Sequence, residues 1–458
     1  MLVAVFRRSS VKAVIWAWIF ASIASCIAAL LQYFDLAQAF APWINAADAG
    51  EAYANLRQRN QFATLTNIGL AALLWTLADH WQRTEKFLSA AQILWVVLAI
   101  GLLVAGNAAS SSRIGLVQLV LVVSLVAAWP SAYRRRLLVI GLGAALAYVL
   151  AALALPSALE TFTHVSGRSV FVRLAQVEGC ESRLILWANV LDLISEKPWT
   201  GWGWGELDYA HYATLYGGER FCAILDNAHN LPLHVAVEFG VPVAVIAFGG
   251  VGWLLLRAAP WRAQQPVHRL AWTVLAVIAV HSMVEYPLWY APFHTAAGLC
   301  IVFLLIPVTP GFKLEPPRWL VMARVGLVLV MAGTLSLIWR DYQEVSQLYL
   351  PPESRSPQVR QRSAAELSRR MLFRNQAEFA ALTTTALTAA NATEMAGLAE
   401  RLLHYSPESR VIEALVESLT LVGRQDEALW HLVRYRAAFP ADYQAWRNRN
   451  FLTPAPAP

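Results

Sequence analysis

The residues best suited to chemistry lie in one polar stretch, residues 178–240, between long apolar segments. Near its end, the sequence Asp-Asn-Ala-His-Asn (226–230) stands directly before an apolar run that opens at Leu231. A neutral imidazole at the mouth of a helix can accept a proton from a hydroxyl group, so His229 is a candidate base. Asn230 could orient it or bind a substrate oxygen. The alternative is that His229 only caps the helix N-terminus.

Arg183 is the candidate anion ligand of the same stretch. It lies in residues 181–194, where apolar side chains recur at helical spacing: Leu184, Trp187, Val190, Leu191 and Ile194. This pattern predicts an amphipathic helix on the membrane surface. The guanidinium fork of Arg183 could bind a phosphate through two hydrogen bonds, or it could be an ordinary solvated side chain.

Tryptophans and cysteines complete the stretch. Residues 197–205 alternate Gly and Trp, which predicts a tight turn that presents indole faces. Trp202 is the candidate sugar contact, with anchoring at the membrane interface as the alternative. Cys180 and Cys222 lie in the same loop, and a disulfide between them would close that loop in an oxidising compartment.

Two further groups of polar residues lie at predicted helix ends. His281 and Glu285 are four residues apart, so we expect them on one helix face. They form either a functional ionisable pair or a structural hydrogen bond that pins two helices. Arg57, Arg59 and Arg113 stand at helix mouths, where a cation near the bilayer needs an anionic partner such as a lipid phosphate. Ordinary polar capping is the alternative for these arginines.

These residues must be positioned by a largely apolar chain. Of its 458 residues, 57% are hydrophobic and 14% are charged, whereas soluble domains carry roughly 25% charged residues. The long apolar runs predict an all-α, polytopic helical membrane protein rather than a barrel. About nine spans of suitable length are predicted, at residues 13–31, 63–78, 88–106, 114–132, 137–156, 231–256, 270–289, 294–308 and 319–339.

The orientation follows from basic residues, which concentrate in alternate loops, for example at Arg83 and Lys86, at residues 134–136, and at Arg257. This bias predicts a cytoplasmic N-terminus. We divide the chain into N-terminal transmembrane helices (1–156), an outer catalytic loop (157–230), further transmembrane helices (231–339), and an outer helical domain with tetratricopeptide-like packing (340–458).

Several function classes are not expected. The net charge of +6 suits an anionic membrane surface, and no motif indicates nucleic-acid binding. No cluster of His, Cys and Asp has metal-ligand spacing, and no phosphate-binding loop for ATP is present. We therefore predict no metal and no cofactor.

Several separated motifs carry a resemblance to a known family. The order Arg-x3-Trp (183–187), Pro-Trp-x-Gly-Trp-Gly (198–203), Ala-His-Asn (228–230) and Glu-Phe-Gly (238–240) is similar to the bacterial O-antigen ligase and polymerase superfamily. RQRNQFAT (57–64), SSSRIG (110–115) and HSMVEYP (281–287), with the helical tail, resemble the narrower group of protein O-oligosaccharyltransferases, or pilin glycosylation ligases.

The resemblance implies a bacterial inner-membrane glycosyltransferase whose catalytic face is periplasmic. A glycan preassembled on undecaprenyl pyrophosphate would be moved to a Ser or Thr hydroxyl of an acceptor protein such as pilin. The family's essential histidine matches His229, followed by Asn230, and its pyrophosphate-binding arginines match Arg183 and Arg113 by position. The chain departs from the family in having about one apolar span before residues 57–64, and Val243 stands where relatives have a small or hydroxyl residue.

Two other functions are considered. A lipopolysaccharide O-antigen ligase would use lipid A–core as acceptor, whereas the soluble helical tail suits a protein acceptor better. A membrane transporter with an outer interaction module is the alternative from another class. Against it, the polar residues cluster at one face and not at the membrane midplane.

Overall fold

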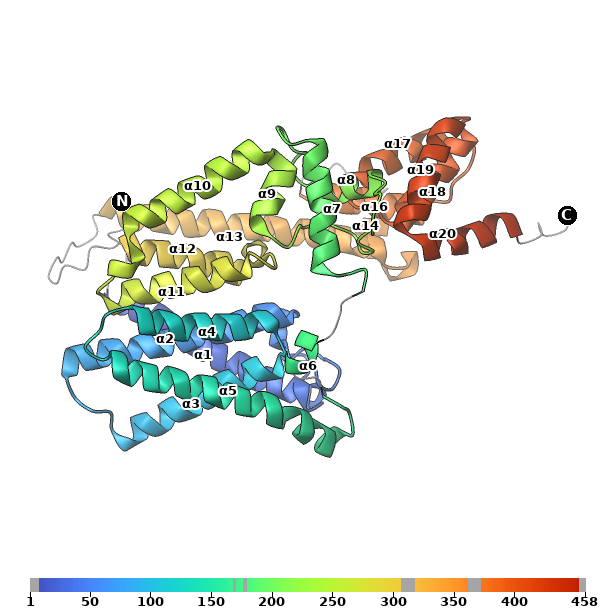
Figure 1. Cartoon of the computed structure of the whole chain (residues 1–458). Helices are drawn as coiled ribbons and strands as arrows, with labels where there is room; N and C mark the ends of the chain where they lie inside the picture. The colour runs from blue at the N-terminus through green and yellow to red at the C-terminus, as the bar shows by residue number, and fades with distance from the viewer. Residues whose placement is uncertain (1–7, 168–169, 176–178, 306–317, 361–371, 453–458) are drawn as a thin grey trace. The chain divides into compact units, whose positions relative to one another are not determined.

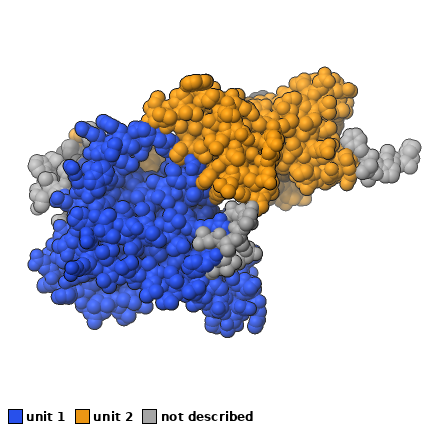
Figure 2. Space-filling model, in the orientation of Figure 1, with its two compact units in different colours: residues 1–177, 229–231, 248–314 blue, residues 178–228, 232–247, 315–458 orange. Residues whose placement is uncertain are grey.

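The computed structural model describes residues 8–167, 170–175, 179–305, 318–360 and 372–452 (Figure 1). Every regular element in these ranges is a helix, which confirms the predicted all-α fold class. The chain forms two compact units, coloured in Figure 2. Unit 1 comprises residues 1–177, 229–231 and 248–314, and unit 2 comprises residues 178–228, 232–247 and 315–458.

Unit 1 is a helical bundle around α2. Its helices are α1 (Arg8–Tyr33), α2 (Arg59–Thr84), α3 (Ala90–Ala109), α4 (Arg113–Ala128), α5 (Arg134–Thr163), α6 (Val170–Ala175), α11 (Pro266–His281) and α12 (Ala291–Leu305). Helix α2 packs against α1, α3, α4 and α11 and is buried along most of its length. Because no water reaches such a helix, its polar groups must bond within the protein. Asn67 accordingly donates to the carbonyl of Gly115 at 3.0 Å.

The chain is an integral membrane protein. Six helical segments of the described residues are long and apolar enough to cross a membrane: Ser10–Tyr33, Arg59–Thr84, Ala90–Ala109, Arg134–Thr163, Val241–Arg262 and Val325–Tyr349. Three apolar helices, α4, α11 and α12, are shorter. Each of the nine predicted spans overlaps one of these segments, although residues 306–308 of the predicted span 294–308 lie outside the described residues. The largest errors are that residues 231–256 are not one helix and that the α-helix predicted over 270–289 ends at His281.

The predicted span 231–256 is broken into α9 (Leu231–Phe239) and α10 (Val241–Ala258) at Gly240. Gly240 has a φ of +88°, and a Cβ there would lie 2.3 Å from the carbonyl oxygen of Trp199. Gly201, at φ +67°, approaches the carbonyl oxygen of Glu238 equally closely. The amides of Trp202 and Gly203 donate to the last carbonyls of α9 at 2.9 Å each. A continuous helix would lose these bonds, which satisfy a helix C-terminus.

Unit 2 joins the outer loop to the tail. Its main helices are α7 (Arg183–Glu196), α8 (Leu207–Ala213), α13 (Arg318–Ser346), α16 (Arg374–Thr384), α17 (Ala392–Leu403), α18 (Ser409–Leu421), α19 (Gln425–Ala438) and α20 (Pro440–Arg447). In the tail, α17 packs on α18 and α18 packs on α19. The apolar faces of these consecutive helices meet in one core, as repeat-like packing requires.

Helix α8 of the loop docks onto the tail. Tyr212 is buried in the tail's core, and its hydroxyl lies 3.0 Å from Nδ1 of His431. Arg434 donates to the carbonyl of Ala213 at 2.7 Å. Nδ1 of His404 lies 2.6 Å from a carboxylate oxygen of Glu206. The loop and the tail are therefore one packed body.

Buried histidines of unit 2 predict a loss of stability in acid. Burial, with the charge of Arg434 nearby, lowers the pKa of His431 to about 4. Burial and the charge of Arg220 lower the pKa of His211 to about 3. Both side chains stay neutral in the folded protein, whereas the unfolded chain binds their protons near pH 6.5. The stability they contribute is complete above about pH 6.5 and declines as the pH falls toward 4.

We expect the melting temperature of the full chain in detergent to fall by several degrees between about pH 7 and pH 5. The fall should be smaller in His431→Gln, with His164→Gln, an exposed histidine of unit 1, as the matched control. Burial raises the pKa of Asp208 to about 7, which acts in the opposite sense, so Asp208→Asn should steepen the fall. Equal pH dependence of melting in the wild type and His431→Gln would contradict the assignment.

Candidate functional site

The segment His229–Leu231 is tied to the turn that follows α11. The amide of Leu231 donates to the carbonyl of Ser282 at 2.8 Å, and the side-chain amide of Asn230 donates to the carbonyl of Met283 at 3.1 Å. His229 itself has a φ of +49°. This left-handed conformation is costly for a residue with a side chain and is typical of functional positions. Asn230 therefore anchors the backbone beside His229.

The imidazole of His229 faces a carboxylate. Its Nε2 lies 3.7 Å from Oε2 of Glu285, and the two side chains are 17% and 11% exposed. The ring of Tyr286 packs edge-on against the imidazole, with centroids 5.0 Å apart. A carboxylate beside an imidazole selects its orientation and stabilises the imidazolium that forms when it takes a proton. The pair can thus act as a general base with an orienting acid.

Two further side chains extend this pair into a chain of hydrogen bonds. Asn60 donates from Nδ2 to Oε1 of Glu285 at 3.2 Å. The hydroxyl of Ser112 donates to Oδ1 of Asn60 at 2.7 Å and accepts from the amide of Gly115 at the start of α4. The residues come from the beginnings of α2 and α4 and from the turn after α11. Sequence reasoning noted their polar segments at helix ends but did not single out Asn60 or Ser112.

The prediction that His281 and Glu285 share one helix face is wrong. Helix α11 ends at His281, because the next amides close tight turns: Met283 donates to the carbonyl of Val280 at 3.3 Å. His281 is fully buried, and its Nδ1 lies 2.8 Å from the hydroxyl of Thr64. Glu285 instead contacts Asn60 and His229. His281 lies in the packed interior of unit 1, where its contact with Thr64 joins α11 to α2, in line with the structural alternative.

Two arginines meet at the beginning of α4. Arg113 donates from Nη2 to the carbonyl oxygen of Arg173, and Arg173 donates from Nη1 to the carbonyl of Ser111 at 3.0 Å. The adjacent Ser112 is the N-cap of α4. Two guanidinium groups beside the positive end of a helix favour binding of an anion. Arg113 was predicted from its place at a helix mouth, whereas Arg173 was not selected as a site residue.

The other predicted arginines of unit 1 are placed differently. Arg59 donates to both carboxylate oxygens of Glu51, at 3.2 and 3.0 Å. Its anionic partner within the described residues is therefore a carboxylate. Arg57 is exposed and has a left-handed backbone, with φ +58°.

Arg183 and Trp202 belong to unit 2. Arg183 is the first residue of α7, capped by the hydroxyl of Ser182. Trp202 donates from Nε1 to the carbonyl of Leu193 at 2.9 Å and packs into an apolar cluster of the loop, with Nζ of Lys197 3.8 Å from its ring centroid. Much of Trp202 is thus already used for packing, and its substrate contact stays a prediction. The exposed indoles of this turn are Trp199 and Trp204.

Cys180 and Cys222 form a disulfide that closes 42 residues of the loop. The cross-link encloses α7 and α8, which carry much of the loop's apolar cluster. In the chain-entropy picture, a loop of this length stabilises the folded state by about 4 kcal/mol.

Removing this disulfide is expected to lower the melting temperature. The double variant Cys180→Ser, Cys222→Ser should melt below the wild type in detergent, because its unfolded state gains freedom. A reductant should lower the melting temperature of the wild type and leave that of the double variant unchanged, which serves as the internal control. A wild type that melts alike with and without reductant would rule out a stabilising disulfide.

Over the ranges that the structure describes, no three His, Cys, Asp or Glu side chains are grouped so as to hold a metal ion.

Comparison with known protein families finds three matching segments. Residues 97–248 match the family described as O-antigen ligase, residues 52–77 match protein glycosylation ligase, and residues 269–452 match the C-terminal part of virulence factor membrane-bound polymerase. Together these segments contain Asn60, Arg113, His229 and Glu285.

A curated relative points the same way. A general O-oligosaccharyltransferase of Acinetobacter baylyi (strain ATCC 33305 / BD413 / ADP1) is 27% identical over 166 residues. The matched region covers 35% of this chain and 27% of that relative's length. No solved structure matches the chain.

Proposed function

We propose that the chain is a member of the O-antigen ligase superfamily, as its partial matches indicate, and that it transfers a preassembled glycan from undecaprenyl pyrophosphate to Ser or Thr hydroxyls of proteins. The observation that carries this proposal is the contact between His229 and Glu285, with Asn60 behind it. A hydroxyl nucleophile needs a base and an orienting group, and unit 1 supplies both. Pilin is one candidate acceptor.

The reaction proceeds by one displacement. His229 takes the proton of the acceptor hydroxyl as its oxygen attacks the anomeric carbon of the glycan. The bond from that carbon to the pyrophosphate oxygen breaks, and undecaprenyl pyrophosphate leaves with the electron pair. Glu285 stabilises the imidazolium that results. The displacement inverts the anomeric centre.

Charge on the leaving group is met by Arg113 and Arg173. Pyrophosphate gains negative charge as the bond breaks, and fixed guanidinium groups beside a helix N-terminus stabilise that charge. Arg183, at the start of α7, is proposed as a further ligand of the pyrophosphate. Arg57 is proposed to contact lipid phosphate.

We place the catalytic face in the periplasm of a bacterial inner membrane. The support is the disulfide of residues 180 and 222, which needs an oxidising compartment. The basic residues 134–136 belong to the opposite, cytoplasmic side by the positive-inside bias. Reporter fusions at Arg135 and Ala380 should therefore report opposite sides of the membrane.

A second candidate is an O-antigen ligase that acts on lipid A–core, favoured by the match of residues 97–248. The test uses the purified full chain with an undecaprenyl-pyrophosphate-linked glycan and, in separate reactions, pilin or lipid A–core. In cells, mass spectrometry compares the glycans on periplasmic proteins with and without the gene. Glycan on protein supports the first proposal, glycan on lipid A–core supports the second, and no transfer in any reaction rejects both.

A further inference from the structure

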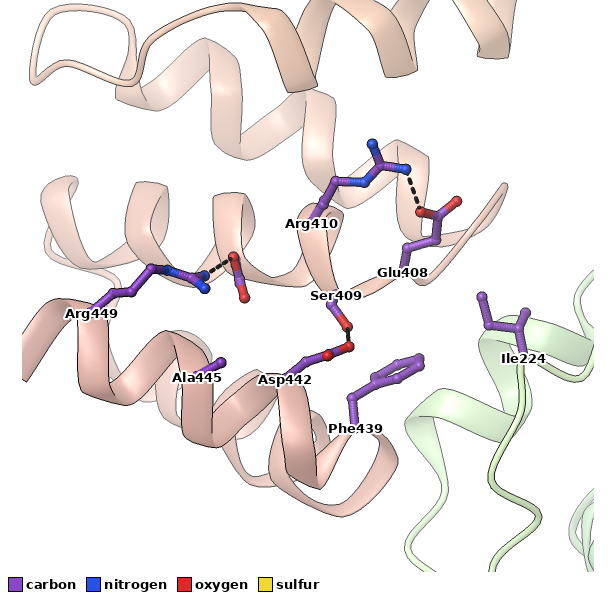
Figure 3. Close-up of a pocket in the computed structure, with 9 residues that line it drawn as sticks. Ile224, Glu408, Ser409, Arg410, Phe439, Asp442, Ala445 and Arg449 are labelled. Carbon is purple, nitrogen blue, oxygen red and sulfur yellow. Dashed lines mark hydrogen bonds and ion pairs between the residues drawn. The ribbon is translucent and has the colours of Figure 1, made fainter. Parts of the chain in front are cut away.

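A cleft opens in unit 2 between the first turns of α18 and helix α20 (Figure 3). Its volume is about 450 Å3, within the range of sites that bind ligands in proteins. Its lining combines one residue of the outer loop with eight of the tail: Ile224, Glu408, Ser409, Arg410, Glu413, Phe439, Asp442, Ala445 and Arg449.

One part of the cleft is apolar. Ile224, 41% exposed, and Phe439 lie on the same side of it, and Ala445 on α20 lies on the other side of Asp442 (Figure 3). Ile224 stands two residues after Cys222, so the disulfide fixes the loop that supplies this wall. An exposed apolar wall held in place by a cross-link suits an aliphatic side chain of a partner.

The charges of the cleft favour a cationic group. Arg410 is paired with Glu408 at 3.0 Å, and Arg449 is paired with Glu413 at 3.0 Å. Asp442 differs, because its interaction is with the hydroxyl of Ser409, which points toward it from α18 (Figure 3). The structure describes every residue of this lining. Among its three carboxylates, only Asp442 forms no ion pair with a neighbouring arginine.

We propose that this cleft binds a segment of the acceptor protein that carries an aliphatic side chain next to a lysine or arginine. The aliphatic side chain packs on Ile224 and Phe439, and the cation pairs with Asp442. The inference rests on the proposed function, which makes a protein the acceptor. In sequence, Ile224 precedes His229 by five residues.

The test measures binding without any glycan donor. Three fluorescein-labelled nonapeptides of Ser, Thr and Ala carry a central Leu followed by Lys, Gln or Glu. Fluorescence anisotropy with the full chain in detergent should show the Lys peptide bound most tightly and the Glu peptide least, with the difference shrinking at high salt. Equal binding of the three peptides overturns the proposal.

Two variants separate the charge of the cleft from its shape. Asp442→Asn should weaken binding of the Lys peptide about threefold, as expected for an exposed ion pair, and Asp442→Lys should reverse the preference toward the Glu peptide. Ala445→Trp fills the cleft and should weaken all three peptides at least about tenfold. The matched controls are Asp426→Asn on α19 and Ala441→Trp on α20, exposed positions outside the lining; a control that weakens binding equally overturns the assignment.

Failure of this inference is distinguishable from failure of the proposed function. His229→Asn should bind the Lys peptide as the wild type does, while its rate of glycan transfer falls about 10²–10⁴-fold. If the wild type prefers the Lys peptide but transfers no glycan, the proposed cleft stands and the proposed transferase activity is rejected. If the wild type transfers glycan but binds the three peptides equally, the proposed transferase activity stands and the proposed cleft is rejected.

Discussion

Replacing His229 with asparagine is expected to lower the rate of glycan transfer about 10²–10⁴-fold, the usual contribution of a general base. Asparagine is chosen because it tolerates the left-handed backbone of this position, so the turn before α9 is kept. The measurement is the initial rate with saturating lipid-linked donor and acceptor protein, at equal amounts of inserted enzyme. A rate within about tenfold of the wild type would remove His229 from the role of base.

Glu285→Gln provides the matched test of the orienting group. Glutamine keeps the size of the side chain and can still accept from Asn60, but it loses the negative charge next to the imidazole. We expect a smaller rate loss than in His229→Asn. We also expect the acid limb of the pH–rate profile to move to lower pH, because a neighbouring carboxylate raises the pKa of an imidazole and its removal lowers it. A purely structural Glu285 would leave the pH profile in place.

The second large effect is expected from the arginine pair at the start of α4. Arg113→Gln and Arg173→Gln should each raise the KM for the lipid-linked donor about 10- to 100-fold, the range for a lost hydrogen bond to a charged group. Arg113→Lys should fall between, because lysine keeps the charge and loses the fork. The KM for the acceptor should not change.

Arg135→Gln is the control for the arginine pair, since Arg135 is an exposed cation on the predicted cytoplasmic side. If the two variants instead lower the melting temperature and leave the donor KM at the wild-type value, Arg113 and Arg173 serve only the structure. The bonds that each makes to a backbone carbonyl make this second readout necessary.

The membrane helices were the most predictable part of the fold. Helices α3 and α5 contain long apolar runs, and length and hydropathy alone locate them. Helix α2 was predicted as residues 63–78 and spans Arg59–Thr84. Its polar residues, among them Thr64 and Asn67, are buried against other helices. They lower the hydropathy of the segment, so hydropathy alone predicted a helix shorter than α2. The break at Gly240 was missed because hydropathy does not report φ.

The site was predictable only in part. His229, Asn230 and the two cysteines follow from local patterns. The contact of Asn60 with Glu285 joins residues 225 positions apart, and no periodicity in a single sequence records such a pairing. Arg173 was missed for the same reason, because the carbonyl that Arg113 binds becomes visible only when α4 and α6 are packed.

The close approach at Gly201 and Gly240 couples any movement of the Trp-Gly turn, residues 197–205, to α9. The backbone of each glycine lies against the backbone of the other segment with no side chain between them, so neither segment can move without displacing the other. Trp199 and Trp204 project from the same turn with 78% and 86% of their surfaces exposed. A lipid headgroup or a sugar that binds these indoles would therefore also displace the C-terminal end of α9, the helix that starts two residues after His229.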